Sequence, residues 1–245
     1  MPTEWLSLET WRHVGLWTLA GALLGMGLER IVLALPAWVL APYGDQVQAE
    51  DWRGPGGGLF SKPHPVRWMA LACLNALIWT ACALWSPPAG QGLTLGVWAW
   101  AVCGTAFLVL AAVDWNTTLL PDVLVWPLVW AGLLASERHW TAVPLAVSLW
   151  SVVLWYLAMQ ALAWGFERVT GRTGMGEGDA KLLAAMAAWW GWQPVLWALL
   201  WGSVLTLVAG WFWRRRGLAP WAHVPFGPFL VMGIGLWTAW AGVSA

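Results

Sequence analysis

Charge is scarce in this chain of 245 residues, because Asp, Glu, Lys and Arg make up only 10% of it. A soluble domain carries about 25% charged residues, so the composition excludes an ordinary soluble protein. Acidic and basic residues number 12 each, and this zero net charge gives no indication of nucleic-acid binding. Hydrophobic residues, 60% of the chain, form runs near the roughly 20 residues that cross a bilayer. The sequence therefore predicts an all-α, polytopic membrane protein surrounded by lipid.

Cysteine is scarce as well. Cys73, Cys82 and Cys103 all lie in apolar runs, and no Cys-x-x-Cys pair occurs, which argues against a zinc ribbon or a disulfide framework. No basic residue precedes Arg12, whereas Glu4 does. This start is a poor match to a cleavable signal peptide, so the first span is expected to be retained.

The apolar runs divide into about eight expected transmembrane helices, and polar sequence between them is too short for a sizeable soluble domain. We therefore expect one integral membrane domain over residues 1–245, with its longest polar loop at 42–67. The expected spans are Val14–Leu40, Trp68–Trp85, Leu93–Val113, Leu119–Ala135, Ala142–Trp164, Ala180–Trp192, Val195–Trp213 and Pro225–Val243.

Basic residues gather in the loops after the first, fifth and seventh spans, which all fall on one side of the membrane. An excess of Lys and Arg marks the cytoplasmic side. Both termini are therefore expected outside, and the three basic loops, 42–67 among them, are expected in the cytoplasm.

The most polar interruption in the second half of the chain is Gly174–Lys181, read Gly-Met-Gly-Glu-Gly-Asp-Ala-Lys. Its Asp179 stands where the sixth span begins. Asp114 ends the third span, 65 positions earlier, and the predicted topology places both acids on the cytoplasmic side. Asp122 lies just inside the fourth span on the same side and is a possible third member. An ionisable group within a membrane costs at least about 2.5 kcal/mol, so each is a functional candidate.

Two carboxyl groups held close together share one proton, because ionising both places two negative charges side by side. This state suits an aspartic protease, in which one carboxylate activates water and the protonated partner polarises the scissile carbonyl. Gly176 and Gly178 are expected to let an extended substrate approach and to adopt backbone angles that other residues resist. The sixth span, about 13 residues long, also suggests a thinned or water-accessible region.

Two other interpretations stay open on these residues alone. Gly-x-Gly-Asp also occurs at ordinary helix starts, where aspartate caps the helix. A non-catalytic membrane scaffold or transporter, whose acids bind a cation, would also place carboxylates near the membrane. Glu29 and Arg30, adjacent in the first span, are expected to have a structural role with local partners.

Four stretches, in order, carry a resemblance to a known family. The first is a degraded glycine-to-proline stretch at residues 25–36, and the second is an aspartate followed by Leu-Pro-Asp, at residues 114–122. The third is the Gly-x-Gly-Asp motif with its lysine, at residues 174–192, and the fourth is Pro-Phe-Gly-Pro-Phe at residues 225–229. The chain resembles the bacterial prepilin peptidases, or type IV leader peptidases, which are membrane aspartic proteases of the Gly-x-Gly-Asp class. The resemblance covers nearly the whole chain.

This resemblance implies cleavage of the short basic leader of type IV prepilins or pseudopilins at the cytoplasmic face of the bacterial inner membrane, without a metal or cofactor. Asp114 and Asp179 would be the catalytic pair. The supporting motif residues would be Gly176, Gly178, Lys181, Pro121, Asp122, Pro225 and Gly227. Many family members also methylate the new N-terminus with S-adenosylmethionine.

Several departures from the family pattern fall in the N-terminal half, which is associated with methylation. Most members hold two Cys-x-x-Cys pairs around zinc in the first cytoplasmic loop, and residues 42–67 have no cysteine. Glu29 and Ala34 replace the family's asparagine and arginine, and the stretch before Trp68 has lost a glutamate. We therefore expect the peptidase activity to be kept. Whether methylation is kept, or the chain is a peptidase for secretion or DNA-uptake pseudopilins only, stays open.

Overall fold

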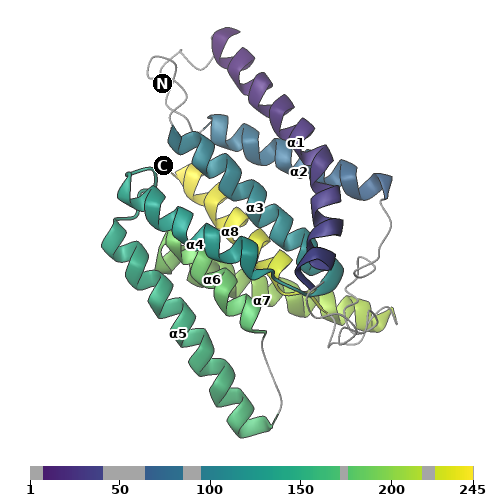
Figure 1. Cartoon of the computed structure of the whole chain (residues 1–245), viewed down its shortest axis with the longest axis vertical. Coiled ribbons are helices and arrows are strands. Elements are labelled where there is room, and N and C mark those ends of the chain that lie inside the picture. The colour runs from purple at the N-terminus through teal and green to yellow at the C-terminus, as the bar shows by residue number, and fades with distance from the viewer. Residues whose placement is uncertain (1–7, 41–63, 85–94, 172–175, 217–223, 245) are drawn as a thin grey trace.

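A computed structural model of the chain describes residues 8–40, 64–84, 95–171, 176–216 and 224–244 (Figure 1). This described part holds eight α-helices and no β-strand, and each predicted span corresponds to one helix. The helices are α1 (Leu8–Leu40), α2 (Pro65–Leu84), α3 (Leu95–Thr117), α4 (Asp122–Glu137), α5 (Leu145–Thr170), α6 (Glu177–Trp190), α7 (Trp192–Arg215) and α8 (Gly227–Ser244). The all-α prediction is confirmed.

Five helices, α1, α2, α3, α5 and α7, are long and apolar enough to cross a membrane. The apolar part of α8 is shorter, over Gly227–Ala241, and α4 and α6 have only 16 and 14 residues. Exposed Leu, Trp and Val side chains cover the outward faces of the long helices, as lipid contact requires. The protein is a multi-pass membrane protein.

The short helix α6 is the centre of the fold. It packs against α4, α5, α7 and α8 (Figure 1). Ala180 and every residue from Leu182 to Trp189 are at most 2% exposed. A 14-residue helix rises only about 21 Å, less than the hydrocarbon core of a bilayer. Because other helices surround α6, it is short without having to span the lipid alone.

Close backbone approach and hydrogen bonds hold α6 in place. A Cβ atom on Gly132 of α4 would lie 2.6 Å from Ala188 Cβ, so only glycine allows this contact. The indole N–H of Trp189 donates to the Leu128 carbonyl of α4 at 2.9 Å, and the Ser148 hydroxyl of α5 donates to the Ala188 carbonyl at 2.7 Å. Such bonds satisfy polar groups that find no water in this core.

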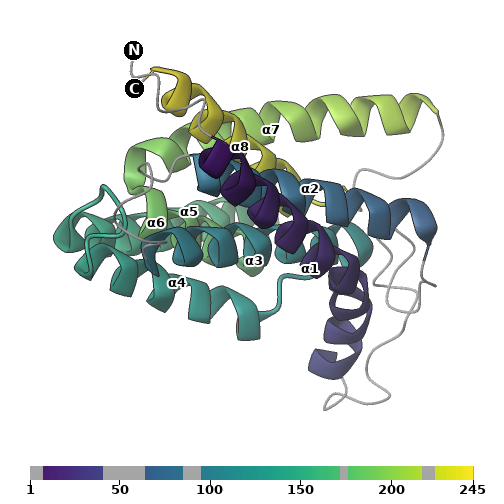
Figure 2. The same ribbon diagram turned by 90° about the horizontal axis from the view of Figure 1, so that it is seen from above.

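The N-terminal helices α1 and α2 form a hairpin that lies against α3 (Figure 2). A Cβ on Gly25 would lie 2.6 Å from Ala72 Cα, so the two backbones are nearly in contact, as small residues permit between membrane helices. Asn75 is fully buried and donates to the Gly21 carbonyl at 2.8 Å. Trp98 at the start of α3 stacks near Trp17 of α1, with ring centroids 4.7 Å apart.

The first turn of α2 differs from the sequence prediction. The polar loop was expected to continue to Arg67, but α2 begins at Pro65, so Pro65 to Arg67 are helical. Proline at the first position of a helix is favourable because its missing N–H would have no helical partner there. Residues 42–63 of the predicted loop lie outside the described residues.

Candidate active site

Asp114 lies within the last turn of α3, because this helix continues to Thr117 rather than ending at Val113. The side chain is buried, at 4% exposure. Its Oδ2 accepts a hydrogen bond from the backbone N–H of Gly227, the first residue of α8, at 2.9 Å. The positive end of the α8 dipole thus faces this carboxylate, an arrangement that stabilises an anion.

Asp179 is the third residue of α6 and follows Gly176, which is the N-cap. The helix begins three residues earlier than the predicted span, so this acid is part of its first turn. The backbone N–H of Gly176 donates a hydrogen bond to the Asp179 carboxylate. This return to the N-cap resembles one half of a capping box. Asp179 is only partly buried and is therefore the more accessible of the two acids.

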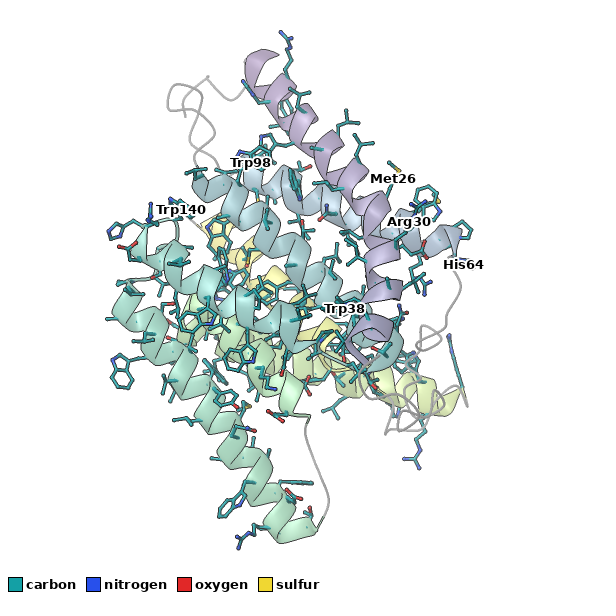
Figure 3. The ribbon with its side chains drawn as sticks, in the orientation of Figure 1. Met26, Arg30, Trp38, His64, Trp98 and Trp140 are labelled. Atoms are coloured by element: carbon teal, nitrogen blue, oxygen red, sulfur yellow. The ribbon has the colours of Figure 1, made fainter. Side chains whose placement is uncertain are left out.

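The two acids meet at one end of the bundle, where α3 ends and where α6 and α8 begin. Gly178, next to Asp179, packs against Leu120 in the connection that follows α3, which brings the first turn of α6 to the end of α3 that carries Asp114. The electrostatic effect of Asp114 on Asp179 agrees with this placement. Trp115 and Trp213 stack near each other, with ring centroids 5.5 Å apart, which places the arginine-rich end of α7 at this same end. The side chains of Trp98 and Trp140, labelled in Figure 3, lie at the opposite end of the bundle.

The glycines of the Gly-x-Gly-Asp motif have a different role from the predicted one. Gly176 has φ −70° and ψ 141°, an ordinary extended conformation, and Gly178 is helical, so the prediction of unusual backbone angles is wrong for both. Gly178 instead allows close packing, since a Cβ there would lie 2.9 Å from Leu120 Cβ. The connection between α3 and α4 therefore rests directly on the first turn of α6.

Gly227 has a comparable steric role in the Pro-Phe-Gly-Pro-Phe stretch. A Cβ at this position would lie 2.8 Å from Asp114 Oδ2 and would block the hydrogen bond. Pro225 is buried beside it, just before α8. The stretch thus places the Gly227 N–H, which has no partner within its own helix, against the buried Asp114 carboxylate.

Asp122 and Lys181 form an ion pair across the start of two helices. Asp122 is the first residue of α4, directly after its N-cap Pro121. Lys181 Nζ lies 3.0 Å from Asp122 Oδ2 and 2.9 Å from Glu177 Oε1. Asp122 is at the same end as the two acids, as predicted, but it pairs with a lysine. Lys181 thereby joins α4 to the turn that carries Asp179.

Three further residues at this end were not singled out as site residues by the sequence. Arg67 of α2 contacts both Glu29 and Asn116, and Asn116 stands two positions after Asp114. Thr118 has φ 54°, a left-handed conformation that is uncommon for a β-branched residue, between the two aspartates of the first motif. The only sequence signal was the adjacent pair Glu29 and Arg30, which was expected to have local partners; in the structure Glu29 pairs with Arg67.

The structure shows no site suited to a metal ion within the described ranges, where no three His, Cys, Asp or Glu side chains come together. Two open cavities lie away from the acids. One is lined by α5 residues such as Trp150 and by Trp192, and the other surrounds the connection between α4 and α5 near His139.

Residues 101–211 match the model of the type IV leader peptidase family. Among relatives, a protein of Dickeya chrysanthemi named prepilin leader peptidase/N-methyltransferase is 38% identical over 177 residues, which are 72% of this chain and 59% of that protein. A protein of the same name from Pseudomonas aeruginosa is 35% identical, over 70% of this chain and 56% of that protein. Another from Burkholderia pseudomallei is 40% identical, over 65% of this chain and 50% of that protein.

This chain thus spans between half and three fifths of the length of these curated relatives. No solved structure matches it significantly. The family match runs from within α3 to within α7 and so includes Asp114, Asp122 and Asp179. By these matches, residues 101–211 of this chain form a domain of the type IV leader peptidase family.

Proposed function

We propose that this protein is a membrane aspartic endopeptidase that removes the leader peptide from type IV prepilins or pseudopilins. Asp114 and Asp179 are its catalytic pair. The observation that carries the proposal is the meeting of these acids, 65 positions apart, at one end of the helical bundle. The names of the relatives support the substrate class.

The environments of the two acids suit different roles. The hydrogen bond from Gly227 favours an ionised Asp114, whereas the burial of this side chain disfavours the charge, so Asp114 can hold the shared proton or release it. Asp179 is more accessible, which places it where substrate and water arrive. Because adjacent carboxyls share one proton, one acid activates the attacking water while the protonated one polarises the scissile carbonyl. The proton then passes to the leaving amine, and the water oxygen becomes part of the new carboxyl terminus.

The basic residues at this end indicate which side of the membrane it faces. Arg67, Lys181 and the arginines that end α7 all lie at the end that carries the acids. The excess of positive charge favours the cytoplasmic side. We infer that cleavage occurs at the cytoplasmic face of a bacterial inner membrane, with both termini on the opposite side.

The direct test is cleavage of a purified prepilin by the purified protein in detergent, followed by mass spectrometry of the product. Asp114→Asn and Asp179→Asn should each abolish cleavage, with a loss of at least about 10³-fold, because each removes a group that takes part in proton transfer. Both variants should still insert and unfold like the unsubstituted protein. Full cleavage by either variant would overturn the assignment of the catalytic pair. No cleavage by the unsubstituted protein would favour the alternative of a non-catalytic scaffold.

Methylation of the new N-terminus is a second candidate activity, because the relatives are named as N-methyltransferases too. Glu29 stands where the family has asparagine, and its carboxylate is already paired with Arg67 at 2.9 Å. This pairing neutralises the carboxylate, which therefore presents no unpaired negative charge to a cationic methyl donor. We therefore propose a peptidase that does not methylate. Adding S-adenosylmethionine to the same assay tests this, since a product heavier by one methyl group would contradict it.

A further inference from the structure

A buried polar cluster joins α1, α2 and α3 close to the proposed catalytic end. Glu29 is 5% exposed, and its Oε1 accepts hydrogen bonds from the Arg67 side chain and from the His64 backbone N–H, both at 2.9 Å. Figure 3 shows His64 and Arg30 on the same side of the molecule, where the start of α2 lies beside α1. A carboxylate buried this deeply requires such partners, so the guanidinium is confined to one place.

From this position Arg67 reaches the helix that carries Asp114. Its Nη1 donates to Asn116 Oδ1 at 3.3 Å. Asn116 is 1% exposed and stands in the last turn of α3, two positions after Asp114. The planar fork of arginine allows one side chain to hold Glu29 and Asn116 at once. The cation also lies near the C-terminal end of α3, where the helix dipole favours positive charge.

The amide of Asn116 is not explained by folding alone. Its Nδ2 is buried, and it makes no hydrogen bond to any of the described residues. An unpaired buried donor costs free energy, so an apolar side chain of similar size would suit the fold better. The oxygen of this amide is what the structure uses, as the acceptor for Arg67.

The last turn of α3 is thus held from two directions. Gly227 of α8 binds the Asp114 carboxylate, while Arg67 of α2 binds Asn116, which projects from another side of the helix. The connection that follows contains Thr118 in its left-handed conformation. A contact on each side sets both the rotation and the position of this turn. We propose that Arg67, held by Glu29, is a positioning residue that orients Asp114 toward Asp179 through Asn116.

This inference rests on the proposed function, and its test uses the same cleavage assay with the full chain in detergent. Asn116→Leu should lower kcat about 10- to 100-fold with KM within twofold, because a small misplacement of a catalytic group slows the chemical step. Its thermal unfolding should change little, because the substitution removes the unpaired amide donor together with the long hydrogen bond from Arg67. A merely structural contact would not separate kcat from stability in this way.

Arg67→Met should lower kcat to a similar extent, and Arg67→Met combined with Asn116→Leu should be no slower than the slower single variant. Such non-additivity is expected when two residues act through one contact. If Arg67→Met fails to insert because Glu29 loses its partner, Asn116→Leu decides alone. The matched control is Thr18→Val, which removes a 2.7 Å hydrogen bond to Thr80 between α1 and α2, away from Asp114, and should leave kcat unchanged.

The outcomes separate this inference from the proposed function. Cleavage by the unsubstituted protein, loss with Asp114→Asn, and full kcat with Asn116→Leu would overturn the positioning role alone. A kcat loss with Thr18→Val equal to that with Asn116→Leu would also overturn it, because the hairpin as a whole would then matter. No cleavage by the unsubstituted protein would overturn both.

Discussion

The N-terminal hairpin, α1 and α2, and the bundle formed by α3 to α8 differ in what fills their interiors. In the bundle, α6 is enclosed by apolar side chains, and half of the most apolar 18-residue stretch of α3 is buried. The corresponding stretch is 28% buried in α1 and 22% in α2, but it is also only 22% buried in α5 and α7, so the difference lies in α3 and α6. Glycine contacts occur in both regions, and the hairpin adds a chain of buried polar side chains, Asn75 and Glu29 among them.

This difference indicates how the two regions serve the proposed reaction. A close-packed centre tolerates little displacement, so α6 and the helices around it hold Asp114 and Asp179 rigidly. The family match likewise begins within α3 and leaves the hairpin out. The hairpin then acts on the acids only where it touches the last turn of α3. Four substitutions test this division of roles.

The largest effect is expected from Gly227→Ala in the bundle. The new Cβ would lie 2.8 Å from Asp114 Oδ2, so the carboxylate must move and lose its hydrogen bond to the α8 backbone. Removing a hydrogen bond to a charged group costs about 1.5–3 kcal/mol, so cleavage should fall about 100-fold in the prepilin assay.

Gly235→Ala is the matched control on the same helix, because nothing lies within 4 Å of a Cβ there. It should cleave like the unsubstituted protein. Equal activity of the two alanine variants would show that the α8 backbone is not needed to hold Asp114.

Gly132→Ala should destabilise the bundle by about 1–3 kcal/mol, the usual cost of overpacking a filled interior. Its Cβ would lie 2.6 Å from Ala188 and 2.7 Å from the Trp189 ring, and α6 has no free space into which it can shift. Thermal unfolding in detergent measures this. Gly165→Ala on α5, where a Cβ meets open space, is the control and should be neutral or slightly stabilising. An unchanged unfolding temperature for Gly132→Ala would mean that α6 is less tightly enclosed.

Lys181→Met should have a smaller effect, a loss of cleavage of about fivefold. Lys181 is 12% exposed, but its partners Asp122 and Glu177 are 55% and 62% exposed, so water weakens both ion pairs to about 1 kcal/mol together. Arg138→Met, which breaks an exposed pair with Glu137 at the opposite end of α4, should leave the cleavage rate unchanged. A 100-fold loss with Lys181→Met would instead assign the lysine a direct part in the reaction.

The bundle was also the region best predicted from the sequence. Eight apolar runs and the asymmetry of basic residues were enough to place Asp114 and Asp179 at one end, because topology alone dictates which helix ends share a side. Helix ends were less predictable, since Asp114 lies inside α3 and Asp179 inside α6. Hydropathy falls off at charged residues, whereas backbone hydrogen bonding continues past them.

The roles of individual side chains depended on contacts that no local pattern reveals. The glycines of the motif suggested unusual backbone angles, but Gly178 is needed because Leu120, 58 positions earlier, packs against it. Arg67 was predicted to lie in a loop, because the polar residues before it give no sign that α2 has already begun at Pro65. Its partners come from α1 and α3, and only the fold brings them to it.

The smallest effect is expected from Asn75→Leu in the middle of the hairpin. Asn75 donates to the Gly21 carbonyl and accepts from Thr105, both at 2.8 Å, and thereby joins α1, α2 and α3. Hydrogen bonds between membrane helices average about 0.6 kcal/mol, so this variant should loosen the hairpin by about 1 kcal/mol. Faster hydrogen exchange in α1 and α2 would show it. Cleavage should stay within twofold, because two turns of α2 separate Asn75 from Arg67 and no catalytic acid depends on the hairpin at that depth. A loss as large as that of Gly227→Ala would mean that the hairpin and the bundle form a single catalytic unit.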